Sequence, residues 1–277
     1  DFDFGPQVTA ALARRARFPF LGANIIETST GQPPPWVHSR VLFEEARLEF
    51  VGLISSDMPL LTTEKARVGL QFPLEWITLE RMVPAPRSIL LTHCGHEPDF
   101  DLARKDHRFR AILGGHSHKT VSEFVEGTYV GQSGSRGTMV DVVTLDPGGN
   151  VSGHLEEVKV SEGEDPAVQA ILNRYAPEID RVMEVVVGEL SEKVTKDGRG
   201  SSTLGNWLCD LMKEKVHADV AFQNRTGIRA SMKKGEVRER DLYQVSPFHN
   251  TLVTMTLTGR QIVQVLEHSV DEARYLM

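Results

Sequence analysis

Cysteine and long apolar runs are both scarce in this 277-residue sequence. Its two cysteines, Cys94 and Cys209, are far apart and form no Cys-x-x-Cys pair, which argues against a disulfide framework and against a zinc site built from cysteines. The longest apolar stretches, around residues 50–54 and 89–91, have the length of strands and are too short to cross a bilayer. The sequence therefore predicts no membrane span.

An excess of positive charge is also lacking. Lys and Arg number 31 and Asp and Glu number 38, which gives a net charge of -7. A DNA- or RNA-binding protein is expected to carry a basic surface, so we expect no nucleic-acid partner. A small anion such as a nucleotide remains compatible, because it needs only a few local arginines or a metal ion. The content of 40% hydrophobic and 25% charged residues is typical of globular proteins.

Short apolar segments alternate with polar ones in the first half of the sequence. Strands are expected at residues 18–24, 41–43, 47–55, 88–92, 111–114, 129–133 and 139–145, and a helix is compatible with residues 101–108. Several of these apolar runs end abruptly in polar residues. Such a pattern favours a layered α/β sheet with its chemistry at the strand ends.

A polar stretch at residues 161–166 separates the two halves. Asp165 is suited to a helix N-cap and Pro166 to the first helical position. The apolar residues that follow have helical spacing, so we interpret residues 161–184 as a helix that links two domains, although a helix packed inside one continuous domain is an alternative. Further on, we expect a strand region at 185–194, helices at 203–215 and 259–268, and a buried strand at 218–223.

Histidines follow two of the expected strands. Gly114-Gly115 precede His116 and His118, which are two residues apart and can face one space on an extended backbone. For an isolated pair, solvent-exposed loop histidines would be the favoured interpretation. His93 also ends an apolar strand and is closely followed by a glycine. This second histidine position makes a shared metal site the better interpretation. We therefore predict part of a metal site, with the metal left open because imidazole suits several divalent ions.

Other polar positions are weaker signals by themselves. Asn24 in a Gly-Ala-Asn turn is usually explained by backbone tolerance, and Asp3 could belong to a ragged terminus. In the second half, Arg229 follows a glycine turn and could reach a phosphate, while Phe248 could stack on a base. A surface ion pair for Arg229 and core packing for Phe248 are the ordinary alternatives.

Taken together and in order, these segments resemble the 5′-nucleotidase family, which includes UDP-sugar hydrolases and cyclic-nucleotide phosphodiesterases. In the first half, the matching segments are Asp1-Phe2-Asp3-Phe4-Gly5, Phe18 to Ile25, Leu91-Thr92-His93-Cys94-Gly95 with Asp99, Leu102 and Ala103, and Gly114-Gly115-His116-Ser117-His118. In the second half, they are Ser202 to Trp207, Asn224 to Arg229, and Pro247 to Thr251. The resemblance covers nearly the whole sequence.

The resemblance implies an α/β fold: a partial four-layer metallophosphoesterase β-sandwich flanked by helices (residues 1–160), a linker helix (161–184) and a smaller, incomplete α/β nucleotide-binding domain (185–277). It implies that His93, His116 and His118 are metal ligands and that Asp3 orients a catalytic histidine. The residues that it implies for nucleotide binding are Asn224, Gly227, Arg229, Phe248 and, less directly because of its spacing, Arg199.

Three departures from the family pattern bear on these expectations. The family's Asp-x-His, Gly-Asp and Gly-Asn-His motifs would lie before Asp1, so the sequence given is expected to hold metal poorly. Thr226 stands where the family usually has glycine, which could narrow the binding loop. The sequence ends at Met277, before the family's second base-stacking aromatic residue.

The implied function of the intact protein is hydrolysis of nucleotide phosphoesters with two divalent metal ions, such as zinc or manganese. The substrate could be a nucleoside monophosphate, a UDP-sugar, a cyclic nucleotide or a thiosulfate ester. The alternative is a catalytically inactive family member that acts as a structural or interaction subunit. Family resemblance further implies a periplasmic, secreted or cell-surface location.

Overall fold

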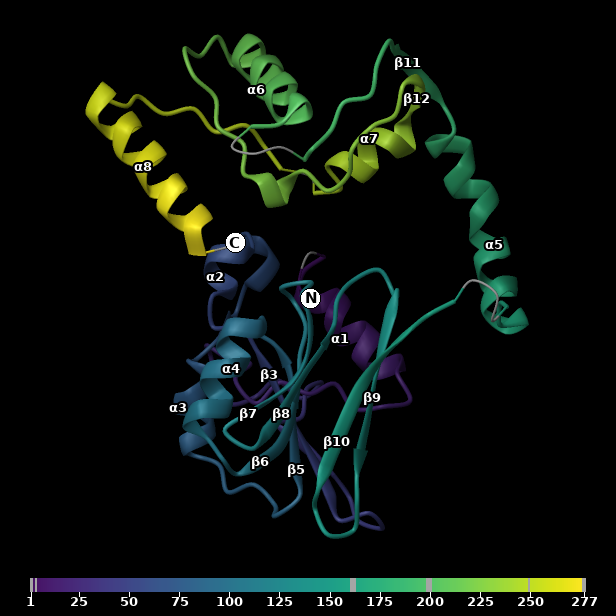
Figure 1. Ribbon diagram of the computed structural model, residues 1–277, viewed down its shortest axis with the longest axis vertical. Coiled ribbons are helices and arrows are strands. Elements are labelled where there is room, and N and C mark those ends of the chain that lie inside the picture. The colour runs from purple at the N-terminus through teal and green to yellow at the C-terminus, as the bar shows by residue number, and fades with distance from the viewer. Residues whose placement is uncertain (1, 3, 160–162, 198–200, 249, 276–277) are drawn as a thin grey trace. The chain divides into compact units, whose positions relative to one another are not determined.

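The computed structural model describes residues 2, 4–159, 163–197, 201–248 and 250–275. The chain forms two compact units, Asp1–Gly163 and Glu164–Met277 (Figure 1). Each unit combines helices with strands, which confirms the predicted α/β class. The role of residues 161–184 as a linker stays a prediction.

A six-stranded sheet forms the centre of unit 1. Its strand order is β2-β3-β5-β6-β8-β7, and the strands are β2 (Arg40–Phe43), β3 (Leu48–Ile54), β5 (Ser88–His93), β6 (Phe109–Leu113), β8 (Thr128–Ser133) and β7 (Thr120–Val125). The four inner strands run parallel, and the edge strands β2 and β7 are antiparallel to their neighbours. Inner parallel strands are covered on both faces, which explains their nearly continuous apolar sequences.

Helices cover one face of this sheet and a hairpin covers the other (Figure 1). On the helical face, Leu90 and Ile112 pack with residues of α3 (Glu75–Glu80) and α4 (His96–Lys105). On the opposite face, Ile89, Ala111 and Tyr129 pack against the hairpin β9 (Met139–Leu145) and β10 (Val151–Glu157). Successive side chains of a strand point to opposite faces, so each strand contributes to both interfaces. These layers form the described part of the predicted sandwich.

A smaller apolar cluster contains Phe2, Ile25 and Phe72, with Trp36 packed against it. The Phe2 ring lies 5.6 Å from that of Phe72 and 6.3 Å from that of Trp36. The short elements of this region are α1 (Pro6–Arg15), β1 (Ile26–Glu27), α2 (Met58–Leu61), η1 (Glu64–Arg67) and β4 (Leu70–Gln71).

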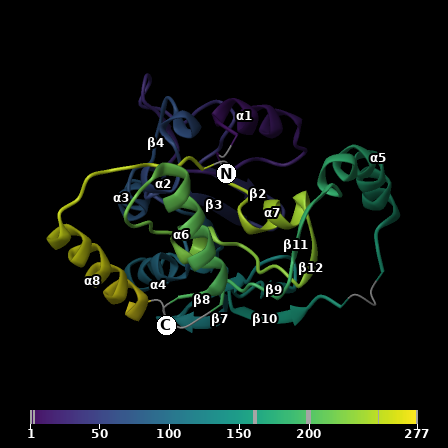
Figure 2. The same ribbon diagram turned by 90° about the horizontal axis from the view of Figure 1, so that it is seen from above.

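Unit 2 has a small core, in which Leu204, Ile228 and Val237 are buried. Its elements are α5 (Pro166–Met183), β11 (Val186–Leu190), α6 (Thr203–Val216), η3 (Arg225–Gly227), β12 (Gly235–Arg238), α7 (Glu239–Val245) and α8 (Gly259–Tyr275). Strands β11 and β12 pair antiparallel, and α7 lies beside them (Figure 2). As predicted, Asp165 caps α5, since its carboxylate accepts hydrogen bonds from the main-chain N–H groups of Ala167 (2.7 Å) and Val168 (3.1 Å).

Three predicted elements need correction. Residues 18–24 form only one isolated bridge, between Leu21 and His38, because Pro19 lacks an N–H group and the chain turns where the N–H of Ile25 bonds to the carbonyl of Gly22. The helix expected at 101–108 is α4, which begins at His96. Residues 218–223 form no strand and pair with no other strand in the described part of the chain, and Phe222 there is 48% exposed rather than buried.

Candidate functional site

The ends of two neighbouring parallel strands bring His93 and His116 together. His93 is the last residue of β5, and His116 lies in the loop that follows β6. Because Leu91 of β5 pairs with Leu113 of β6 in parallel register, the two strands end at the same edge of the sheet. The centroids of the two imidazole rings are 5.1 Å apart, with an angle of 67° between the ring planes. The structure therefore places these two predicted ligands side by side.

Glycines allow the two histidine loops to approach each other. A Cβ on Gly115 would lie 3.4 Å from Nδ1 of His93, and a Cβ on Gly95 would lie 3.7 Å from Cδ2 of His116. Gly95 also has a φ of 100°, which a residue with a side chain rarely adopts. Each loop thus places a glycine, which has no side chain, next to the histidine of the other loop.

The electrostatic environment favours neutral imidazoles. Partial burial lowers the pKa of His93 below its ordinary value. The pKa of His116 is also lowered, first by partial burial and then by the neighbouring charges of His93 and His118. A neutral imidazole keeps a nitrogen lone pair for a metal ion. The adjacent Cys94 differs, because burial raises the pKa of its thiol and keeps it protonated at neutral pH.

The His116 loop has an unusual backbone. His116 and His118 both have positive φ angles, of 82° and 58°. Residues other than glycine adopt such angles infrequently, and strained conformations persist where surrounding contacts hold them. Ser117, between the two histidines, provides such contacts: its hydroxyl donates to Oε1 of Gln132 at 2.8 Å and accepts from the N–H of His96 at 3.2 Å.

Sequence reasoning missed a buried polar network beneath the two loops. The hydroxyl of Thr92 donates to Oδ1 of Asp99 at 2.6 Å, and Nε2 of Gln132 donates to Oδ2 of Asp99 at 2.7 Å. Asp99 is fully buried and Gln132 is 2% exposed. The available signal was the presence of Thr92 and Gln132 inside otherwise apolar strands, since buried polar side chains need partners.

Asn24 was explained at the sequence level by backbone tolerance, and this explanation is wrong. The side chain of Asn24 is fully buried. Its amide donates to the carbonyls of Ile54 (2.7 Å) and Pro73 (3.0 Å), and its oxygen accepts from the N–H of Ile54 (3.0 Å). Asn24 therefore fixes the end of β3, next to the end of β5 that carries His93.

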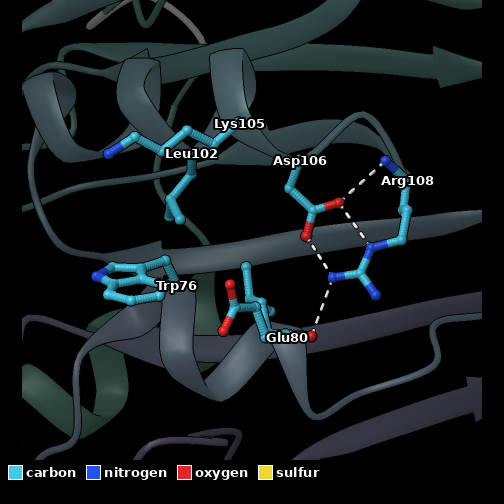
Figure 3. Close-up of a pocket in the computed structure, with 7 residues that line it drawn as sticks. Trp76, Glu80, Leu102, Lys105, Asp106 and Arg108 are labelled. Carbon is cyan, nitrogen blue, oxygen red and sulfur yellow. Dashed lines mark hydrogen bonds and ion pairs between the residues drawn. The ribbon is translucent and has the colours of Figure 1, made fainter.

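Unit 1 contains two of the cavities formed by the described residues. One, of about 320 Å³, lies between α3 and α4 and is lined by Trp76, Glu80 and Lys105 among others (Figure 3). It contains none of the predicted site residues, and its Asp106 and Arg108 are paired with each other. The other, of about 280 Å³, is largely apolar and includes His93 in its lining.

Three of the predicted nucleotide-binding residues, Asn224, Gly227 and Arg229, lie in or close to η3. The guanidinium of Arg229 lies 5.8 Å from the centre of the Phe248 ring, which is 43% exposed. Asn224 immediately precedes η3, and its amide donates to the hydroxyl of Thr226 at 3.0 Å. A Cβ on Gly227 would lie 2.5 Å from Oδ1 of Asn224, so glycine is needed there for a close approach. Asp3 and Arg199 lie outside the described residues.

Comparisons with known proteins give a consistent result. Residues 186–276 match the model of the 5′-nucleotidase C-terminal domain. The crystal structure of a 5′-nucleotidase precursor from Thermus thermophilus is similar over 97% of this chain and 61% of its own, with a TM-score of 0.82 and 26% sequence identity. These comparisons support the 5′-nucleotidase family for this chain.

Two Bacillus subtilis proteins are further relatives of this chain. Endonuclease YhcR is 25% identical over 92% of this chain and 23% of its own length. The trifunctional nucleotide phosphoesterase protein YfkN is 32% identical over 66% of this chain and 14% of its own length. The chain thus spans less than a quarter of either relative.

Similarity to 5′-nucleotidases and metallophosphoesterases implies a divalent metal ion, and the donor chemistry of the histidine site fits one. His93 and His116 are adjacent and favour their neutral forms. Within the described residues, however, no group of three or more His, Cys, Asp or Glu side chains could hold a metal ion. The described site is therefore compatible with part of a metal centre. None of the helices in the described ranges has the length and apolar character to cross a membrane.

Proposed function

We propose that the intact protein hydrolyses nucleotide phosphoesters, with His93, His116 and His118 as part of the ligand set of a divalent metal centre. The observation that carries this proposal is the 5.1 Å separation of the His93 and His116 rings at the end of two parallel strands. Loops at this edge of an α/β sheet are where ligands usually bind.

The metal would supply an activated water molecule and would neutralise phosphoryl oxygens, and two ions such as zinc or manganese suit this chemistry. The contribution of the chain's own residues is to hold the ligands. His93 and His116 would offer neutral nitrogen donors, and the bare glycine backbone at Gly95 and Gly115 leaves room around their rings. Asp3 is proposed to orient a catalytic histidine, as family resemblance implies.

Unit 2 is proposed to hold the nucleotide. The exposed ring of Phe248 offers a face for stacking on a base, and Arg229 could form charge-assisted hydrogen bonds with an anionic or ribose oxygen. Asn224 and Gly227 would contribute the adjacent loop, and Arg199 is a further candidate. We also propose that α5 links the two units and that the protein acts in the periplasm, outside the cell or at its surface.

The test is phosphate release from a nucleoside monophosphate by the intact protein, with and without added zinc or manganese. We expect metal-dependent turnover that His116→Ala reduces to the background rate, because a ligand is lost. His154→Ala is the matched control: its side chain is 62% exposed, it lies on β10, and it pairs with Glu156 at 3.0 Å. It should retain full turnover.

The same assay separates this proposal from an inactive structural or interaction subunit. Turnover that is equal in the wild type and His116→Ala would contradict the ligand assignment. An intact protein that releases no phosphate from nucleoside monophosphates, and that forms no hydrolysis product from UDP-sugars or cyclic nucleotides, with any of the added metals would favour the non-catalytic alternative.

A further inference from the structure

We propose that the buried side chains of Thr92, Asp99 and Gln132, together with the half-buried side chain of Ser117, form a positioning network that sets the separation of the His93 and His116 imidazoles. None of the four is proposed as a ligand or as a group that touches substrate. The relevance of the network to metal binding rests on the proposed function, whereas its effect on the two imidazoles can be tested without metal.

The network connects the two histidine loops by an unbroken path. Thr92, the residue before His93, donates to Asp99 of α4, and Gln132 of β8 donates to the other oxygen of the same carboxylate. The second amide atom of Gln132, Oε1, accepts from Ser117, which lies between His116 and His118. Four hydrogen-bonding side chains from four chain segments therefore join one histidine loop to the other.

Burial makes this path stiff. Asp99 is fully buried, Gln132 is 2% exposed and Thr92 is 8% exposed, so water cannot easily replace a lost partner. A buried donor or acceptor without a partner bears the full desolvation penalty, which is larger for a charged group. Loss of one member should therefore displace the others rather than leave them in place.

The backbone of the His116 loop needs such support. Its two histidines have positive φ angles of 82° and 58°, and Ser117 is the residue between them. Ser117 is fixed from two sides, by Gln132 and by the N–H of His96 at the start of α4. Without the Ser117 hydroxyl, we expect this loop to relax toward ordinary backbone angles and to carry the His116 ring away from His93.

A purely structural role is the competing explanation, and strand β5 offers a matched control. At its other end, the hydroxyl of Ser88 donates to Oε2 of the buried Glu49 at 2.5 Å. Ser88→Ala thus removes a buried hydroxyl–carboxylate bond from the same strand, but far along it from the histidines. Both Ser88→Ala and Thr92→Val should destabilise unit 1, and only Thr92→Val should disturb the histidine pair.

The decisive experiment is NMR of the metal-free full chain with selectively labelled histidine. The 5.1 Å ring separation predicts a nuclear Overhauser effect between ring protons of His93 and His116 in the wild type. We expect Thr92→Val and Ser117→Ala to weaken this effect several-fold or abolish it, while Ser88→Ala and the hydroxyl-preserving Thr92→Ser retain it. If Thr92→Val fails to fold, Ser117→Ala at the half-buried loop position decides the question.

Equal signal intensity in the wild type, Thr92→Val and Ser117→Ala would overturn the proposal, and so would an equal loss in Ser88→Ala. Absence of the signal in the wild type would also overturn it, since the arranged pair would then not exist.

A second measurement, on the intact protein, tests the consequence for metal binding, with Co²⁺ as the probe and its dissociation constant from competition titration. Partners of metal-binding residues typically affect affinity by about 10- to 100-fold, so we expect weakening of this size in Thr92→Val and Ser117→Ala and no change in Ser88→Ala. A wild type that binds no Co²⁺ contradicts the proposed metal function, and the metal-free measurement then still decides the network. If a variant loses the nuclear Overhauser effect but keeps the wild-type affinity for Co²⁺, the network does not contribute to metal binding, and that part of the proposal is overturned.

Discussion

We expect the substitution Gly114→Ala to disrupt the hydrogen-bond network that lies beneath the two histidine loops. The Cβ of Gly114→Ala would lie 2.0 Å from Oδ2 of Asp99, 2.8 Å from Oγ1 of Thr92 and 2.9 Å from Nε2 of Gln132. All three separations are shorter than a real carbon atom tolerates. Gly114 has no positive φ, so the effect of the substitution would come from this collision and not from backbone strain.

The size of the effect follows from the hydrogen bonds of Asp99. To make room, its carboxylate must give up the bond from Gln132, the bond from Thr92, or both. A hydrogen bond to a charged group contributes about 1.5–3 kcal/mol, so we expect Gly114→Ala to lower the free energy of unfolding by roughly 2–5 kcal/mol. In Gly115→Ala, the nearest contact is an ordinary 3.4 Å to His93, and the loss should stay within about 0.5 kcal/mol.

The assay is urea unfolding followed by tryptophan fluorescence in a Trp207→Phe background. The sequence has three tryptophans, and removal of Trp207, which belongs to unit 2 and is 40% exposed, leaves Trp36 and Trp76 to report on unit 1. The midpoint and slope of this transition give the free energy of unfolding for each variant.

A double-mutant cycle with Asp99→Ala identifies the cause. Once the carboxylate is gone, the alanine at position 114 has lost its closest clash, so the two substitutions together should cost much less than the sum of their separate effects. Strict additivity, or equal stability of Gly114→Ala and Gly115→Ala, would refute the reasoning.

Three further outcomes are expected. Phe248→Ala should raise KM for the nucleotide by about 5- to 150-fold, as the loss of about 1–3 kcal/mol of stacking predicts, while Phe248→Tyr should leave KM near the wild-type value in steady-state assays. Burial raises the pKa of Asp99 from 3.8 to about 6. The protonated carboxyl therefore stabilises the fold at low pH, and this contribution is lost as the pH rises through about 6. In urea unfolding between about pH 4 and about pH 8, the free energy of unfolding of the wild type should fall by up to about 3 kcal/mol relative to that of Asp99→Asn. Asp165→Ala should destabilise α5 by about 1 kcal/mol through loss of its two capping bonds, visible as faster amide exchange in its first turn.

The histidine pair could be predicted from the sequence because it depends on local patterns and one general rule. His93 and His116 each follow a short apolar run, and neighbouring parallel strands end at the same edge of a sheet. The N-cap of α5 could be predicted for the same reason, since Asp165 and Pro166 are neighbours in the sequence and occupy the positions that begin a helix.

Features that depend on distant partners could not be predicted in this way. Gln132 lies 33 positions along the chain from Asp99, and nothing in its neighbours indicates that bond. Residues 18–24 have the composition of a strand, but pairing also needs donors and a partner, and Pro19 supplies no donor. Hydrophobicity alone assigned Phe222 to a buried strand, whereas the fold leaves it 48% exposed.

The two buried carboxylates at opposite ends of β5 differ in a way that separates stability from function. Burial by itself would raise the pKa of Glu49, but hydrogen bonds from Ser88, Ala85 and Arg40 outweigh it and lower the pKa, so the ionised form is well accommodated. For Asp99, burial prevails over its two hydrogen bonds, which come from neutral groups, and the pKa rises. At neutral pH, ionised Asp99 therefore destabilises the fold at the histidine end of β5, whereas ionised Glu49 at the other end does not. Natural proteins break the rules of stable packing at functional sites, and the raised pKa of Asp99 at the histidine end of β5 agrees with the site proposed there.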